Sequence, residues 1–277
     1  MRLERSPSPG ASAEMTEVRR RFALPLAGAL GLWAAWTVAT YLLEGRVLTL
    51  LRPEAVGQRV LYVVAANLAI GTVGAGLVLR WLSRRGWVRL ARAGFGPRAR
   101  SAVAVCVGAV LGLVASLARG GPSLDPVVLL NGFAQVLPVS IAEVLVCWAV
   151  VGAVSESLLH DRLGAGSAVV AAAVAASLFG AYHYAHSPPF NSHAMVAALA
   201  AVGVMTGAFF FISRDVYGTI AFHNLLALRG VVGALERGGQ LDAYATPQPA
   251  LLGMAAAAVA LLLLVDRGSR RSVADPR

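Results

Sequence analysis

Long apolar runs separated by short segments that carry arginine extend along almost the whole chain. Each run reaches about 18 residues or more, the length that an α-helix needs to cross the hydrocarbon core of a bilayer. The pattern therefore predicts an all-α, polytopic membrane protein with about eight transmembrane helices. The runs cover approximately residues 22–43, 59–82, 101–118, 127–160, 167–185, 194–213, 216–235 and 248–265.

The fourth run and the two ends of the chain require separate interpretation. Residues 127–160 are too many for one straight span, and Pro138 predicts a break or kink that leaves a short lead-in before the membrane helix. Residues 1–18 are rich in Ser, Pro, Ala and Glu and contain no apolar core, so we expect a disordered tail and no cleavable signal peptide. We expect a single membrane domain over 19–266, followed by a basic cytoplasmic tail over 267–277.

Composition agrees with this class of protein. Hydrophobic residues make up 57% of the chain and charged residues only 14%, whereas a soluble domain has about 25% charged residues. All 24 basic residues are arginine, and the net charge is +10. The arginines are dispersed between the runs, which argues against nucleic acid as a partner. The bilayer is the expected partner.

The distribution of arginine also predicts the orientation. If the N-terminus is cytoplasmic, 18 arginines fall on the inner side and six on the outer side. This bias satisfies the positive-inside rule for eight spans with both termini in the cytoplasm. We expect an integral protein of the cell membrane.

A few ionisable or amide side chains lie within the apolar runs, where they are costly and indicate a functional site. A desolvated glutamate can activate water, a histidine can help to hold that water, and a second histidine with an amide can stabilise an oxyanion. This set suffices for the hydrolysis of a peptide bond. The candidates are Glu156, His183, His223 and Asn224, with Glu143 and Asn131 as further candidates nearer the outer side.

Three segments resemble the motif regions of the CAAX-protease and bacteriocin-processing family of intramembrane proteases. They are "ESLLHDRL" (156–163), "FGAYH" (179–183) and "GVMTGAFFFISRDVYGTIAFHN" (203–224), within a core of about 140–230. The resemblance implies eight helices and an endopeptidase that acts on a membrane-associated peptide. It also implies that Glu156 activates the water, that His183 assists, and that His223 with Asn224 stabilises the oxyanion.

Two of the three segments depart from the family pattern. In the first motif, Ser157 stands where the family has a second glutamate, and Asp161 stands at its arginine position. In the third, Ala227 occupies the place of the asparagine four residues after His223, while Asn224 lies about 100° away around the helix. An inactive membrane scaffold or immunity-type protein, or a small-solute transporter, is therefore an alternative function.

The depths of the candidate side chains set a geometric test. Glu156 and His223 each lie about eight residues from the nearest turn, or some 12 Å deep, whereas His183 lies near 25 Å. On straight helices His183 misses Glu156 by more than about 10 Å. We nevertheless expect Glu156, His183 and His223 to converge on one cavity that opens toward the cytoplasmic leaflet.

Histidine is abundant just after the fifth run, which raises the question of a metal. His183, His186 and His193 form a conceivable zinc cluster, although their spacing matches no HExxH-type helix. The favoured mechanism requires no cofactor, and a divalent metal such as zinc stays open.

Overall fold

The computed structural model of the chain describes the backbone of residues 9–118 and 125–274, and the side chains of 22–118 and 125–270. Eight helical stretches in this part are long and apolar enough to cross a membrane, and they match the eight predicted runs one to one. The predicted all-α, eight-span fold is confirmed. The spans are Phe22–Gly45, Val56–Arg84, Arg98–Leu117, Pro126–Leu163, Gly166–Ala185, His193–Ser213, Val216–Arg237 and Pro249–Arg270.

Several spans are built from more than one helical element. π-helical turns complete the first span and form the middle of the second and the fourth. In chain order the elements are α1 (Pro9–Thr40), η1 (Tyr41–Gly45), α2 (Val56–Tyr62), η2 (Val63–Gly74), α3 (Ala75–Arg84), α4 (Arg98–Leu117), α5 (Pro126–Glu143), η3 (Val144–Gly152), α6 (Ala153–Leu163), α7 (Gly166–Tyr182), η4 (His183–Ala185), α8 (His193–Ser213), α9 (Val216–Arg237), η5 (Leu241–Tyr244) and α10 (Pro249–Ala274).

The N-terminal boundary differs from the sequence-based expectation. Helix α1 begins at Pro9, so it includes most of the segment that the sequence assigned to a disordered tail; residues 1–8 lie outside the described part. The reason is local propensity, because residues 11–21 contain Ala, Glu, Met and Arg, which favour a helix even without an apolar face. Helix α1 thus extends beyond its membrane span.

The fourth span is the centre of the bundle, and it does not break at Pro138. Helix runs without interruption from Pro126 to Leu163 and contains Pro138 within α5. Its most apolar stretch is 94% buried within the protein, compared with 17% for Arg98–Leu117. A helix that is apolar all round is stable when other helices enclose it, and here they do.

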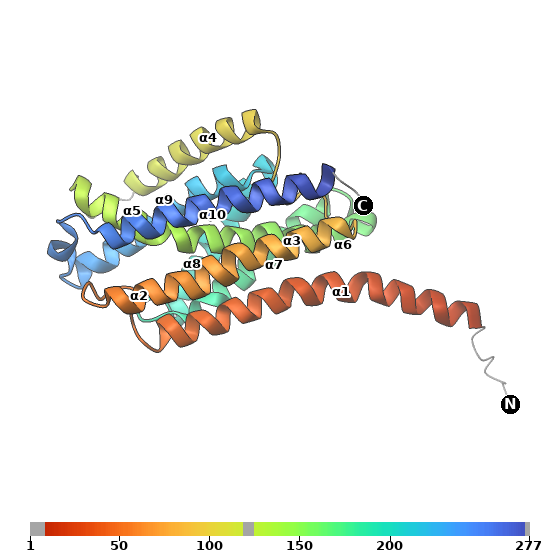
Figure 1. The fold of residues 1–277 in the computed structure, drawn as a ribbon, viewed down its shortest axis with the longest axis horizontal. Coiled ribbons are helices and arrows are strands. Elements are labelled where there is room, and N and C mark those ends of the chain that lie inside the picture. Colours follow the sequence, from red (N-terminus) through yellow and green to blue (C-terminus); the bar gives the residue numbers. More distant parts are fainter. Residues whose placement is uncertain (1–8, 119–124, 275–277) are drawn as a thin grey trace.

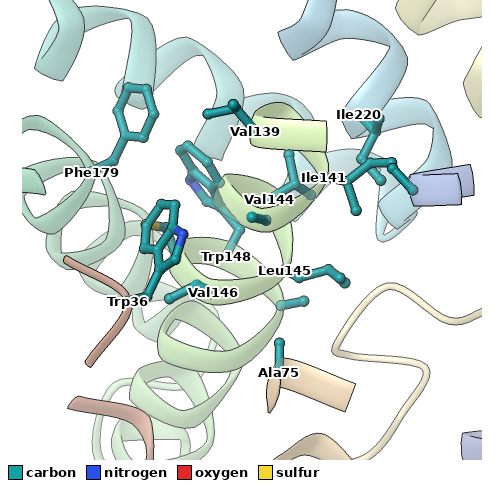
Figure 2. Close-up of a cluster of buried hydrophobic side chains, with 14 of the residues drawn as sticks. Trp36, Ala75, Val139, Ile141, Val144, Leu145, Val146, Trp148, Phe179 and Ile220 are labelled. Atoms are coloured by element: carbon teal, nitrogen blue, oxygen red, sulfur yellow. The ribbon is translucent and has the colours of Figure 1, made fainter. Parts of the chain in front are cut away.

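Aromatic side chains fill the space around this central span. Trp148 lies 5.1 Å from the Phe179 ring, and Trp36 stacks on Tyr182 at 3.7 Å, measured between ring centroids. Figure 2 shows Trp148 and Phe179 approaching each other from neighbouring helices, with Trp36 beside Trp148. These contacts lock α7 against η3 and hold the end of α7, where His183 lies.

Small residues bring α4 close to α9. A Cβ atom on Gly218 would lie 2.6 Å from the backbone of Ala104, and a Cβ on Gly112 would lie 3.0 Å from the Phe222 carbonyl oxygen. Backbones approach this closely in membranes only where small residues form the contact. The pair fixes α9, which carries His223.

We expect Gly218→Ala to push α4 away from α9 and to destabilise the protein. The added methyl group has no room beside the Ala104 backbone, and overpacking of this kind costs about 1–3 kcal/mol. The melting temperature of the purified protein should fall by several degrees. Gly230→Ala on the same helix meets nothing within 4 Å and is the matched control; an equal fall in both variants would contradict close packing at Gly218.

The ends of α6 and α10 lie on the same side of the bundle, and α1 projects beyond the bundle on that side (Figure 1). The connection over residues 85–97, which is rich in arginine, follows α3 at this same end. The connections over residues 46–55 and 186–192 lie at the opposite end of the bundle.

Candidate functional site

Glu143 is the centre of the site. It is the last residue of α5 and lies near the middle of the 38-residue span Pro126–Leu163. Its carboxylate is 2.8 Å from His223 Nε2 through Oε2 and 3.7 Å from His183 Nε2 through Oε1. A glutamate at this depth, from the most buried helix, is brought together with histidines from two other spans.

His223 and Glu143 share a proton. The Thr206 hydroxyl donates to the Val202 carbonyl oxygen at 3.0 Å, so it accepts the hydrogen bond from His223 Nδ1 at 3.0 Å. A neutral His223 then has no hydrogen on Nε2, and the 2.8 Å contact with Glu143 requires a proton on one of the two groups. The pair therefore carries no net charge, which suits its burial.

His183 is oriented by its own helix. Its Nδ1 atom donates to the Phe179 carbonyl oxygen at 2.8 Å, so a neutral His183 presents Nε2 as an acceptor toward Glu143. The separation of 3.7 Å is too long for a direct hydrogen bond. A water molecule placed about 2.8 Å from each atom would contact both groups.

These side chains face a cavity of about 90 Å³. This is room for a few water molecules, since one water needs about 10–15 Å³ on this measure. Ser140, one helical turn before Glu143, also lines the cavity, and its hydroxyl has no hydrogen-bond partner among the described residues. The rest of the wall is mainly apolar and includes Val136, Val139, Phe179, Leu199, Val202 and Leu226.

A second carboxylate, Glu44, lies beside this group. Glu44 accepts hydrogen bonds from the Ser187 backbone N–H at 2.8 Å and from the Ser187 hydroxyl at 2.5 Å. His186 Nδ1 is 3.2 Å from the Glu44 carboxylate, and the His186 and His183 rings are stacked with centroids 5.2 Å apart. The site thus contains two carboxylates and three imidazoles.

Glu156, the residue expected to activate water, is not in this cavity. Its carboxylate forms two charge-assisted hydrogen bonds with Arg214, at 2.5 and 2.6 Å. Glu143 precedes Glu156 by 13 residues, which is roughly 20 Å along a helix. The expected convergence of Glu156 with His183 is therefore wrong. The sequence already showed that Glu156 and His183 lie at different depths in the membrane. The structure explains this difference, because Glu143, and not Glu156, lies level with His183.

Asn224 also points away from the cavity. It is buried, with Nδ2 3.5 Å from the Phe133 carbonyl oxygen, because it lies about 100° around α9 from His223. Ala227 lines the cavity instead, so the position one turn after His223 faces the site without an amide. Of the four predicted residues, the structure brings together His183 and His223 only.

Asn131 has a structural role, because its side chain holds a loop in place. Its amide donates to the carbonyl oxygens of Tyr244 and Thr246 at 2.9 and 2.7 Å and accepts from the Gln248 N–H at 3.0 Å. It fixes the connection between α9 and α10. Burial raises the pKa of the Tyr244 phenol, which therefore stays neutral and donates to Gln135.

The histidine cluster differs in composition from the sequence-based hypothesis. His193 is exposed and bonds Tyr184, with 2.7 Å between His193 Nδ1 and the Tyr184 hydroxyl. Glu143, His183 and His186 instead each offer a ligand atom, and these atoms lie within 4.8 Å of one another. Nε2 of buried His186 has no hydrogen bond within the described part of the chain, while its Nδ1 lies 3.2 Å from the Glu44 carboxylate. The donor set fits a divalent metal ion.

The cavity extends away from the arginine-rich end. Its wall includes Leu50 and Phe190, which belong to the two connections at the opposite end of the bundle. The expected opening toward the arginine-rich side is therefore wrong, because it was derived from the position of Glu156.

No protein-family model, curated protein or solved structure matches the chain. The function of the site must therefore be inferred from its own geometry and from the short motifs.

Proposed function

We propose that the protein is an intramembrane endopeptidase similar to the CAAX-protease and bacteriocin-processing family, with Glu143 as the general base. The observation that supports this proposal is the convergence of Glu143, His183 and His223 on one buried cavity midway along the central span. Each group comes from a different span, and helix-packing contacts alone do not require that arrangement.

The proposed reaction begins with a water molecule held between Glu143 Oε1 and His183 Nε2. Glu143 takes a proton from this water molecule while the water oxygen attacks the carbonyl carbon of the peptide bond. The unpaired Ser140 hydroxyl is a donor for the developing oxyanion, in place of the absent amide at Ala227. The proton then passes to the leaving nitrogen as the C–N bond breaks.

The substrate follows from the walls of the cavity. The site lies within the membrane and is lined mainly by aliphatic and aromatic side chains, so an apolar segment of a membrane-associated peptide or protein is the expected substrate. We further propose that the protein resides in the cell membrane with both ends of the chain in the cytoplasm, because 18 of 24 arginines lie on that side.

The test of this proposal is a comparison of membrane peptides from cells that carry the wild-type protein, Glu143→Gln or Glu156→Gln. Peptides produced by the enzyme should disappear with the first variant only. Persistence of the same products with Glu143→Gln would refute the proposed function.

A metal-assisted hydrolase is the second candidate, and the unpaired Nε2 atom of His186 favours it. Glu143, His183 and His186 would hold the ion, which would polarise the substrate carbonyl or activate water. The favoured mechanism assigns Glu143 to the water instead and requires no ion.

Metal content separates the two candidates. We expect the purified protein to contain well below one zinc ion per chain after dialysis, and a chelator to leave peptide cleavage unchanged. Stoichiometric zinc that is lost in His186→Ala and retained in His193→Ala would support the metal-assisted reaction, since His193 lies outside the cluster. Elemental analysis by mass spectrometry gives the content.

A further inference from the structure

A second pocket lies at the arginine-rich end of the bundle, separate from the Glu143 cavity. Its volume is about 530 Å³, and α6, α7, the end of α8 and the connection over 85–97 enclose it. The polar groups in its wall are Arg89, Arg92, Arg214, His160 and Glu156. Three positive side chains and one negative side chain therefore share a single hollow.

The negative charge is already neutralised. Both oxygens of Glu156 accept from Arg214, and the Arg214 guanidinium also lies over the Phe211 ring, 5.0 Å from its centroid. This fixes Arg214 and satisfies the only carboxylate in the wall. Arg89 and Arg92 are left without an acidic partner among the described residues.

The remaining polar groups in the wall are hydrogen-bond donors. Arg92 Nη2 is 3.3 Å from His160 Nε2, and because arginine has no acceptor, His160 Nε2 must accept. A neutral His160 then carries its hydrogen on Nδ1, which is buried and has no partner within the described residues. A pocket with two uncompensated guanidinium groups favours an oxyanion.

The surroundings of the pocket indicate where that oxyanion comes from. The pocket lies where α6 ends at Leu163 and α7 begins at Gly166, which is the level of a span end. Leu163 and Val169, which adjoin the lining residues Gly164 and Ala168 in the sequence, are large apolar side chains with 47% and 73% of their surface exposed. A lipid would place its phosphate among the arginines and its acyl chains against this apolar surface.

We propose that this pocket binds the headgroup of an anionic phospholipid, with the Arg89 and Arg92 guanidinium groups as donors to the phosphate. Glu156 is then a positioning residue that holds Arg214 at the rim. The proposal does not depend on the peptidase reaction, because no residue of the Glu143 cavity takes part.

Native mass spectrometry of the purified protein in a neutral detergent tests the site. Phosphatidylglycerol should bind in preference to phosphatidylcholine, and Arg89→Gln/Arg92→Gln should weaken this binding about tenfold or more, since each arginine near an anionic headgroup contributes about a factor of five. His160→Phe should weaken it as well, because Arg92 loses the acceptor that holds its guanidinium in position.

The matched control removes the same charge elsewhere on this side. Arg85→Gln/Arg98→Gln alters two exposed arginines outside the pocket and should change binding less than twofold. If both double variants lost phosphatidylglycerol binding equally, the lipid would be held by the general positive charge of this side, and the proposed site would be wrong. Binding of inorganic phosphate at millimolar concentration, without a preference for phosphatidylglycerol over phosphatidylcholine, would overturn the lipid as its ligand.

Discussion

Replacement of Glu143 by glutamine should reduce peptide cleavage by about 10²- to 10⁴-fold, the usual contribution of a general base. The glutamine amide has nearly the same shape as the carboxylate and cannot accept a proton from water. It can still donate to His223 Nε2, which accepts when Nδ1 donates to Thr206. The variant should therefore fold, with a melting temperature close to that of the wild type.

Glu156→Gln is the control for that measurement. Glu156 also lies in the fourth span, but its carboxylate bonds Arg214 in the other pocket. Cleavage should stay within a few-fold of wild type in this variant. If the Glu156 variant lost cleavage as completely as the Glu143 variant, while both were folded, the assignment of the base to Glu143 would be wrong.

Arg214→Gln should produce a large loss of stability. It leaves the Glu156 carboxylate, whose side chain is only 6% exposed, without its charged partner. Removal of one member of a buried ion pair costs about 3–5 kcal/mol, and we expect the lower end because the Arg214 side chain is 21% exposed. Unfolding of the purified protein by heat or denaturant gives the value.

The double variant Arg214→Gln/Glu156→Gln should recover most of the stability that Arg214→Gln loses. Two neutral amides can bond each other, and no unpaired charge is left in the protein. Arg52→Gln supplies the comparison, because the Arg52–Glu54 pair is exposed and such pairs contribute about 0–1 kcal/mol. A double variant as unstable as the single one would show that Arg214 acts through something other than Glu156.

The eight spans were predictable because hydropathy over about 20 residues is set by the bilayer and not by tertiary contacts. The break at Pro138 was not found, since enclosure by neighbouring helices keeps the chain helical where a solvated helix would end. Length and hydropathy therefore gave the number of spans, while packing decided the course of the longest one.

The site was predictable in part. His183 was found through the Phe179–His183 spacing, and its position is fixed within one helix. The motif comparison favours Glu156 over Glu143, because the segment after Glu156 contains two leucines and an arginine, as the family motif does, whereas Val144 follows Glu143. The signal that could have identified Glu143 was depth, since it lies level with His183 when the spans are aligned.

Sequence-based prediction has a second limit, which Glu44 and His186 illustrate. Glu44 directly follows the first apolar run, and His186 follows the end of α7, so each reads as a side chain at the edge of the membrane. Only the fold brings the end of the first span against residues 186 and 187. Contacts between residues more than 140 positions apart are not encoded in any local pattern.

The enclosure of the fourth span has a consequence for how this sequence can diverge. A lipid-facing residue on α4 can be exchanged for another apolar residue of different size, because fluid acyl chains adapt to it. Val144–Gly152 is buried on every side, so a change in size there must be matched by a change on a neighbouring helix. Among descendants of this gene, substitutions in the fourth span should therefore occur as correlated pairs, while those on α4 accumulate independently.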